Sequence, residues 1–348
     1  MAKIPLDIRA LLSAAFDIEK AKTTPVSVNV LIDETVSPDF QAFIRAGFNS
    51  QAAHSRVMMS YFPTQKPDTS LKADITVIAA GSSDEITVLA QTFRHMGSAV
   101  LVVAESAEQI RSCAQVSGVA LPEKDLVVPQ GSINDKEIQA RLADHIGMWI
   151  VETDREKSLA FSLAYPFVRR PLAQHIIVRT AIQNAGVGVV VFVPGADMPV
   201  MTLNQAKMVL QIAAAYGYPL EPERVKELAG VLAGALVCRG VARQAVAVVP
   251  ALGWAIKGAM GYAGTTAIGK AALEYFEQGG NIAGLAAVVG STRDALIKAG
   301  TFIADAPGFQ KAKDAVGPSA RKAVAVVKTK VAPTAISAVK QVVSAVRR

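Results

Sequence analysis

The chain has 348 residues, of which 51% are apolar and 6% aromatic, and its net charge is +7. This length is enough for two domains with cores of their own. The apolar residues are mostly alanine and valine and glycine is frequent, a composition that favours close-packed or membrane-adjacent helices over an enzyme with a deep aromatic pocket.

The positive charge is concentrated at one end of the sequence. Residues 311–348 contain nine basic residues and one acidic residue, so they account for +8 and the remaining chain for −1. The two cysteines, Cys113 and Cys238, have no metal-type spacing, which indicates a reducing compartment without a disulfide framework. The first 20 residues lack the apolar core of a signal peptide, and we therefore expect a cytoplasmic start.

The first part of the chain alternates strands and helices. Strands are expected at 26–33, 55–62, 74–81, 98–106 and 125–130, and helices at 37–48, 82–97, 107–118 and 134–152. Alternation of this kind predicts a doubly wound α/β sheet of about five strands, which we assign to residues 1–155.

The expected strand ends lack the residues that hold a nucleotide. After the first strand the chain reads DETVSPD, and acids such as Asp33, Glu34 and Asp39 would repel a phosphate. The segments after the third and fourth strands, GSSDE and AES, carry neither a switch motif nor a guanine-reading motif. No catalytic, cofactor-binding or metal site is therefore expected.

Two alternatives remain for the acidic strand ends. Ser82 and Glu85 have the spacing of a helix capping box. Acids near Asp33 and Asp84 could instead form a magnesium or phosphoacceptor site in which Ser106 takes part, although no lysine follows the fifth strand until Lys136. The four histidines are scattered without catalytic spacing.

From about residue 170 to 305 the pattern is entirely helical, with a linker near 155–170. Thr202 is a candidate N-cap, and Gly217 is the expected end of its helix. Helices at 223–249 and 252–277 are expected to form a hairpin, because alanine recurs every four residues from 251 to 271 and would allow close packing.

The run GTTAIGKA at 264–271 is one residue short of a phosphate-binding loop, since Ala271 stands where serine or threonine belongs. A phosphate loop follows a strand and opens a helix, whereas this run lies inside an expected helix whose amides are already bonded. We interpret the similarity as coincidental and place Lys270 at a surface or interface.

Residues 170–280 resemble the helical domain of unknown function 697. The resemblance is carried by motif positions that occur in the family's order: Asp197, Pro199, Thr202, Asn204, Gln205, Arg243, Gln244, Pro250, Gly253, Trp254, Thr266, Gly269 and Lys270. It implies a helical domain of a kind often joined to or paired with small GTPase domains and associated with membranes, with no defined reaction. The first domain would then be a degenerate GTPase-like α/β domain.

Residues 306–348 form a basic amphipathic tail that suits an anionic membrane surface. The candidate lipid contacts are Lys322, Lys328, Lys330, Lys340, Arg347 and Arg348. A solvated tail is the alternative, and nucleic acid is not an expected partner because the body lacks interleaved aromatic and basic residues.

Every long apolar stretch of the helical part contains charge, so the sequence is compatible with a helical bundle in water or with a hairpin that inserts partly. The sequence therefore predicts a non-enzymatic interaction or scaffold protein at the membrane periphery, either a pseudo-GTPase or the partner of a GTPase. The alternative is an enzyme that handles a nucleotide or phosphate at an unrecognised site near Asp33, Asp84 or Lys270.

Overall fold

The computed structural model describes residues 7–50, 52–70, 72–190, 197–222 and 253–279. Within these ranges the chain divides into two compact units. One unit is formed by residues 20–175, and the other by the described residues before 20 and after 175.

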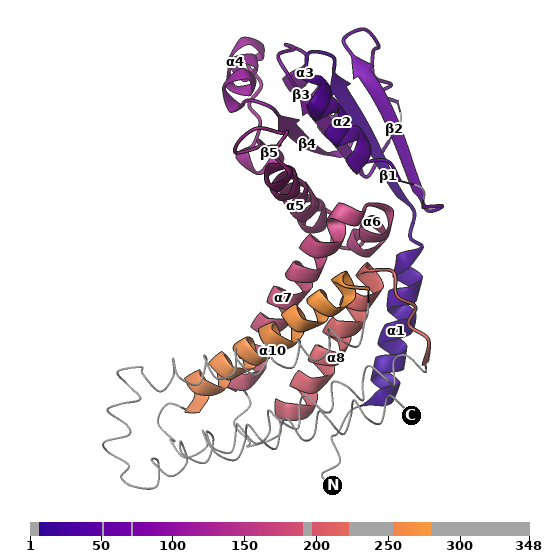
Figure 1. The fold of residues 1–348 in the computed structure, drawn as a ribbon, viewed down its shortest axis with the longest axis vertical. Helices are drawn as coiled ribbons and strands as arrows, with labels where there is room; N and C mark the ends of the chain where they lie inside the picture. The colour runs from indigo at the N-terminus through magenta and orange to yellow at the C-terminus, as the bar shows by residue number, and fades with distance from the viewer. Residues whose placement is uncertain (1–6, 51, 71, 191–196, 223–252, 280–348) are drawn as a thin grey trace, which may run out of the picture. The chain divides into compact units, whose positions relative to one another are not determined.

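The first unit is an α/β domain (Figure 1). Its strands are β1 (Val26–Asp33), β2 (Ser55–Phe62), β3 (Ile75–Ala80), β4 (Ala99–Ala104) and β5 (Leu126–Val127). Its helices are α2 (Pro38–Gly47), α3 (Ile86–His95), α4 (Ala107–Ser117), α5 (Lys136–Thr153) and α6 (Ser158–Ala164), with 3-10 turns η1 (Glu123–Asp125) and η2 (Pro166–Val168).

The five strands are parallel and lie in the order β2-β1-β3-β4-β5. β3 is buried along its whole length, as expected for a strand covered on both faces. The chain moves one way from β1 to β2 and the other way from β3 to β5, so right-handed crossovers place α2 on one face and α3 and α4 on the other. The predicted doubly wound sheet is confirmed, although its fifth strand has only two residues.

The core on the α3 and α4 side joins apolar residues of the sheet and both helices. Leu31, Ile78 and Val102 pack there with Phe93 of α3 and Ile110 of α4, all at most 2% exposed. Burial of this apolar surface is the main favourable term for the domain.

A second buried cluster consists of aromatic rings near the end of the α/β unit. Tyr165 makes an edge contact with Phe48 at a centroid distance of 5.4 Å, and Phe48 makes another with Phe167, also at 5.4 Å. The Tyr165 hydroxyl is hydrogen-bonded to Ser55 Oγ at 3.0 Å. Burial raises the pKa of Tyr165 to about 12, and the Ser55 hydrogen bond acts in the opposite direction.

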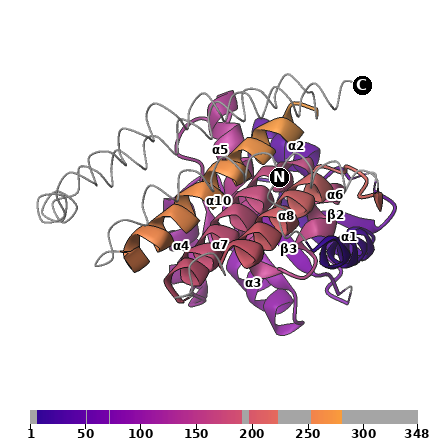
Figure 2. The same ribbon diagram turned by 90° about the horizontal axis from the view of Figure 1, so that it is seen from below.

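The second unit is helical. It contains most of α1 (Ile8–Lys22) and of α7 (Arg169–Val190), with α8 (Asp197–Ala215) and α10 (Gly253–Glu277). α7, α8 and α10 lie side by side in both views (Figures 1 and 2). The predicted all-helical second part is therefore confirmed where the chain is described.

Of the two predicted ends of α8, only the C-terminal one is confirmed by the structure. Gly217 has a φ of 84°, and its amide and that of Tyr218 bond back to Ala214 and Ala213, so the chain leaves the helix as predicted. The N-cap predicted at Thr202 is wrong: α8 begins at Asp197, and Thr202 is a buried residue inside it.

Candidate functional site

The carboxyl end of β1 carries a fully buried carboxylate, that of Asp33. Its Oδ1 atom accepts a hydrogen bond from the amide of Thr35 at 2.9 Å. Its Oδ2 atom accepts from the amides of Gly81 and Ser83, at 3.0 and 3.1 Å, in the segment that follows β3. Asp33 therefore ties the loop after β1 to the loop after β3.

This position is the one at which doubly wound sheets usually bind ligands. In a sheet of this strand order the crevice opens between β1 and β3, where the connections diverge. A bound phosphate would need backbone N–H groups converging on it. Here three such groups converge on the Asp33 carboxylate instead.

Gly81 allows the two loops to approach each other. A Cβ at this position would overlap Thr35 Oγ1 and lie 3.0 Å from the amide nitrogen of Val36. The same threonine hydroxyl accepts a hydrogen bond from the Ser82 amide at 2.8 Å. The loops after β1 and β3 are thus in direct contact at this position.

A second carboxylate, Glu105, acts in the same way after β4. The hydroxyl of Ser37 donates to Oε1 of Glu105, and the Ser37 amide donates to Oε2 at 3.2 Å. Ser37 also caps α2, because its Oγ accepts from the Phe40 amide at 3.4 Å. Glu105 therefore fixes the entry of α2 against the end of β4.

The capping box predicted for Ser82 and Glu85 is wrong. α3 begins at Ile86, and its N-terminus has no side-chain cap. The Ser82 amide bonds to Thr35, and the Glu85 amide is 3.3 Å from Ser83 Oγ. The loop after β3 bonds to the loop after β1 and forms no local cap, because its amides are needed by the buried Asp33 carboxylate.

The charges at the carboxyl ends of β1, β3 and β4 are unfavourable for binding an anion. The three segments 33–40, 81–86 and 104–109 contain acids and no lysine or arginine. Glu34, Asp39, Asp84 and Glu85 are exposed there, and Thr64 Oγ1 donates to Glu34 at 2.6 Å. A triphosphate bound between these three segments would meet negative charge and no neighbouring cation from them.

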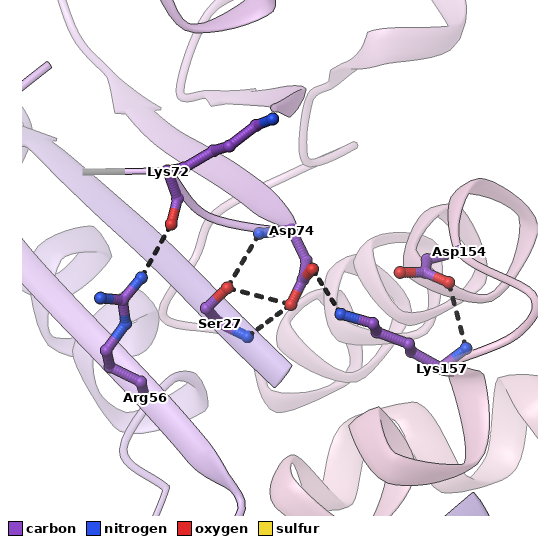
Figure 3. Close-up of polar contacts among 6 residues, drawn as sticks. All are labelled: Ser27, Arg56, Lys72, Asp74, Asp154 and Lys157. Atoms are coloured by element: carbon purple, nitrogen blue, oxygen red, sulfur yellow. Dashed lines mark hydrogen bonds and ion pairs between the residues drawn. The ribbon is translucent and has the colours of Figure 1, made fainter. Parts of the chain in front are cut away.

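At the opposite end of the strands, where they begin, Asp74 precedes β3 and holds several segments together (Figure 3). Its Oδ2 atom accepts from the amide and the hydroxyl of Ser27, at 2.7 and 2.9 Å. Its Oδ1 atom is 2.6 Å from Nζ of Lys157, whose amide bonds to Asp154 at 3.0 Å. This cluster joins the beginnings of β1 and β3 to the start of α6 and serves the fold.

Two of the family-motif positions, Asn204 and Gln205 of α8, meet in a buried polar network. Thr265 of α10 is its centre, and its Oγ1 accepts from Gln205 Nε2 at 2.8 Å and from Asn184 Nδ2 at 2.9 Å. The same hydroxyl donates to the carbonyl of Gly261 at 2.7 Å. Asn184 Oδ1 accepts from Asn204 Nδ2 at 2.9 Å, so the network spans α7, α8 and α10.

Glycines of α10 bring its backbone against α7. A Cβ on Gly261 would lie 2.7 Å from the carbonyl oxygen of Asn184, and one on Gly269 would lie 2.5 Å from Cγ1 of Ile177. These close contacts are made by glycines on another face of the helix than the alanine ridge at 251–271 on which the predicted hairpin rested. The predicted partner at 223–249 lies outside the described residues.

The remaining motif positions that the structure describes all lie in α8 and α10. Asp197 and Gly253 are the first residues of α8 and α10, Pro199 is partly buried and Trp254 lies in α10. Thr266 Oγ1 is buried and has no hydrogen-bond partner in the described part of the chain. Lys270 is exposed in the middle of α10, so the GTTAIGKA run is helical as predicted.

Several predicted positions lie outside the described residues. They are Arg243, Gln244 and Pro250, together with the candidate lipid contacts Lys322, Lys328, Lys330, Lys340, Arg347 and Arg348.

Sequence reasoning missed Asn184 and Thr265. Both are polar residues in long apolar helical stretches, and each is fully buried. A buried polar side chain requires a partner, so an asparagine in the charge-free stretch that begins at Thr180 was the available signal. The resemblance pointed to Thr266, whose hydroxyl takes no part in the network.

Two other kinds of site are absent from the described ranges. No group of three or more His, Cys, Asp or Glu side chains there is arranged to hold a metal ion. None of the helices described is both long enough and apolar enough to cross a membrane.

The chain thus combines a parallel α/β domain, consistent with a GTPase-like domain, with a helical domain after it. The family model described as Domain of unknown function (DUF697) matches residues 167–313, which confirms the predicted resemblance of this part of the chain to that family. The match covers less than half of the chain. No curated protein and no solved structure matches it.

Proposed function

We propose that the protein is a non-enzymatic interaction or scaffold protein, in which a nucleotide-free α/β domain precedes the DUF697 domain. In this proposal it acts as a pseudo-GTPase or as the partner of a true GTPase. The observation that carries the proposal is the Asp33 carboxylate, which accepts three backbone amides at the switch point between β1 and β3.

Two features support a domain that does not hold a triphosphate. The amides nearest the switch point already bond to carboxylates of the chain, and releasing them would leave Asp33 buried and unpaired at a cost of about 1–3 kcal/mol or more. The glycine-lysine run of α10 is mid-helix, so its backbone amides are committed to the helix.

Peripheral binding to an anionic membrane is the second part of the proposal. It is supported by the +8 charge of residues 311–348 and by the alternation of valine and basic residues there. A tail that lacks tryptophan, phenylalanine and leucine after Phe309 would depend on charge more than on apolar insertion.

Calorimetric titration of the full chain with GTP and with ATP, each with magnesium, tests the nucleotide-free state. We expect no binding heat for either nucleotide. Binding in the micromolar range would contradict the proposal, and the variants Ser37→Trp and Lys270→Ala would then locate the site. Loss of binding in Ser37→Trp would place the site at the carboxyl ends of the strands. Loss of binding in Lys270→Ala would favour the alternative of a phosphate-handling enzyme.

A further inference from the structure

The outer edge of the sheet is formed by β2, which is eight residues long and lies at one margin of the sheet (Figure 1). β2 pairs with β1 in regular register from Val26 opposite Ser55 to Asp33 opposite Phe62. In the described part of the chain its other side has no strand beside it. An unbroken edge of this length can take up another strand.

The hydrogen bonds at the two ends of the β1–β2 ladder show which backbone groups face outward. Val26 donates to the carbonyl of His54, and Glu34 donates to the carbonyl of Phe62, both at 2.9 Å. Even-numbered residues of β2 therefore direct their N–H and C=O groups toward β1. The corresponding groups of Val57 and Met59 point away from the sheet and have no partner within the described residues.

The ends of this edge are closed by the chain itself. The amide of Ser55 donates to Ala52 at 2.9 Å, and the carbonyl of Tyr61 accepts from Gln65 at 3.1 Å. The open stretch is thus centred on Met58 and contains three donors (the amides of Val57, Met59 and Tyr61) and three acceptors (the carbonyls of Ser55, Val57 and Met59). Such a short stretch with matched donors and acceptors is complementary to its own antiparallel copy.

The features that usually protect an edge strand are absent from β2. Its sequence SRVMMSYF contains no proline, lysine, glutamate or aspartate, and its register with β1 shows no bulge. Its single charge is Arg56, whose guanidinium is 2.8 Å from the carbonyl of Lys72. The side chain of Met59 is 37% exposed.

We propose that β2 pairs antiparallel with β2 of a second copy of this chain, extending the sheet across a two-fold axis. With Val57 of one copy opposite Met59 of the other, Ser55 lies opposite Tyr61 and all six open groups of each copy can be bonded. Arg56 then lies opposite the uncharged Ser60 of the second copy, so no like charges face each other. An isologous interface of this kind closes as a dimer.

The test measures self-association of the full chain by sedimentation velocity over a wide range of concentration. We expect a monomer–dimer equilibrium that Met59→Lys weakens by about tenfold or more, because a lysine on the edge opposes strand pairing. The matched control is Val88→Lys on α3, which adds the same charge at a residue that is 50% exposed and should leave the dimer unchanged.

Amide hydrogen exchange at single-residue resolution gives a second measurement. The amides of Val57 and Met59 should become protected as the concentration rises, whereas those of Met58 and Ser60, bonded to β1, should be protected throughout. A monomer at every concentration would overturn the inference. So would a dimer that Met59→Lys does not weaken and that leaves exchange at Val57 and Met59 unchanged. Neither result bears on nucleotide binding, so this inference can fail independently of the proposed function.

Discussion

Two adjacent threonines of α10 have opposite environments. Thr265 uses its hydroxyl in three hydrogen bonds, two accepted and one donated. The Oγ1 atom of Thr266 is buried without a partner in the described part of the chain. A hydroxyl stabilises a buried site only when it is bonded, and otherwise its desolvation is a cost.

Replacing each threonine by valine separates these two cases, since valine keeps the shape and the branching. We expect Thr265→Val to lower the free energy of unfolding by roughly 2–3 kcal/mol, because the side-chain amide of Gln205 would lose its acceptor and that of Asn184 would keep only the Met201 carbonyl, at 3.4 Å. Thr266→Val should leave it within about 1 kcal/mol of the wild type or raise it. Urea denaturation followed by circular dichroism gives both values, and equal losses would show that the network does not stabilise the unit.

The buried phenol of Tyr165 gives a pH prediction. Its pKa of about 12 in the folded chain exceeds the ordinary value of 10.0. The folded state therefore holds the proton more tightly than the unfolded state, and the stabilisation is complete below pH 10 and lost as the pH rises toward 12. The loss can reach about 3 kcal/mol.

Comparing the wild type with Tyr165→Phe isolates this titration from those of other groups. The free energy of unfolding of the wild type should fall more steeply than that of the variant between pH 10 and 12, and the two slopes should agree between pH 7 and 9. Parallel curves up to pH 12 would show that the phenol is not shielded in the folded chain.

At the scale of elements, glycine in α10 exchanges helix propensity for close packing. Glycine costs about 1 kcal/mol in a helix relative to alanine, so its presence at Gly261 needs another reason. That reason is the carbonyl of Asn184, which would lie 2.7 Å from an added Cβ. A Cβ added to Gly186 of α7 would meet no atom within 4 Å, so this glycine provides a control.

We expect Gly261→Ala to lower the thermal stability of the chain, by about 1–3 kcal/mol of unfolding free energy, because the Asn184 carbonyl and the side chain of Met201 must move. Gly186→Ala should raise it by up to about 1 kcal/mol through propensity alone. Thermal unfolding followed by circular dichroism measures both. A stabilised Gly261→Ala variant would mean that α7 and α10 are not held at this distance.

The elements themselves were largely predictable from the sequence, because buried parallel strands and long helices leave clear local patterns. The strand from Ile75 to Ala80 is wholly apolar apart from Thr76, and α10 follows an alanine period. The start of α3 and the start of α8 were not predictable in the same way. Before α3, the Ser82 amide bonds to Thr35 of a distant loop. In α8, Thr202 is buried inside the helix. Neither contact is visible in local sequence.

The candidate site was predictable in its chemistry but not in its geometry. The sequence shows acids where a phosphate loop would stand, and this is a local observation. It does not show that Asp33 would accept amides from a segment almost fifty residues away, because that contact depends on β1 and β3 being neighbours. The hydrogen bond between Asn204 and Asn184 was not predictable either, because it depends on α8 and α7 being neighbours.

At the scale of the whole molecule, charge is divided between a nearly neutral body and a tail of +8. A basic segment near an anionic membrane gains about 1 kcal/mol per lysine or arginine, and this gain falls as salt shortens the screening length. Membrane binding by this chain should therefore depend on residues 311–348, on anionic lipid and on ionic strength.

Flotation with vesicles tests this dependence in the full chain. We expect it to float with vesicles rich in phosphatidylserine at low salt, to float less as salt is raised, and to remain unbound with phosphatidylcholine alone. Replacing Lys322, Lys328, Lys330, Lys340, Arg347 and Arg348 by glutamine should abolish binding, whereas Lys136→Gln with Arg141→Gln, both exposed on α5, should preserve it. Binding that persists without the six tail charges would locate the membrane contact in the body of the protein, and no binding by the wild type would remove the membrane from the proposed function.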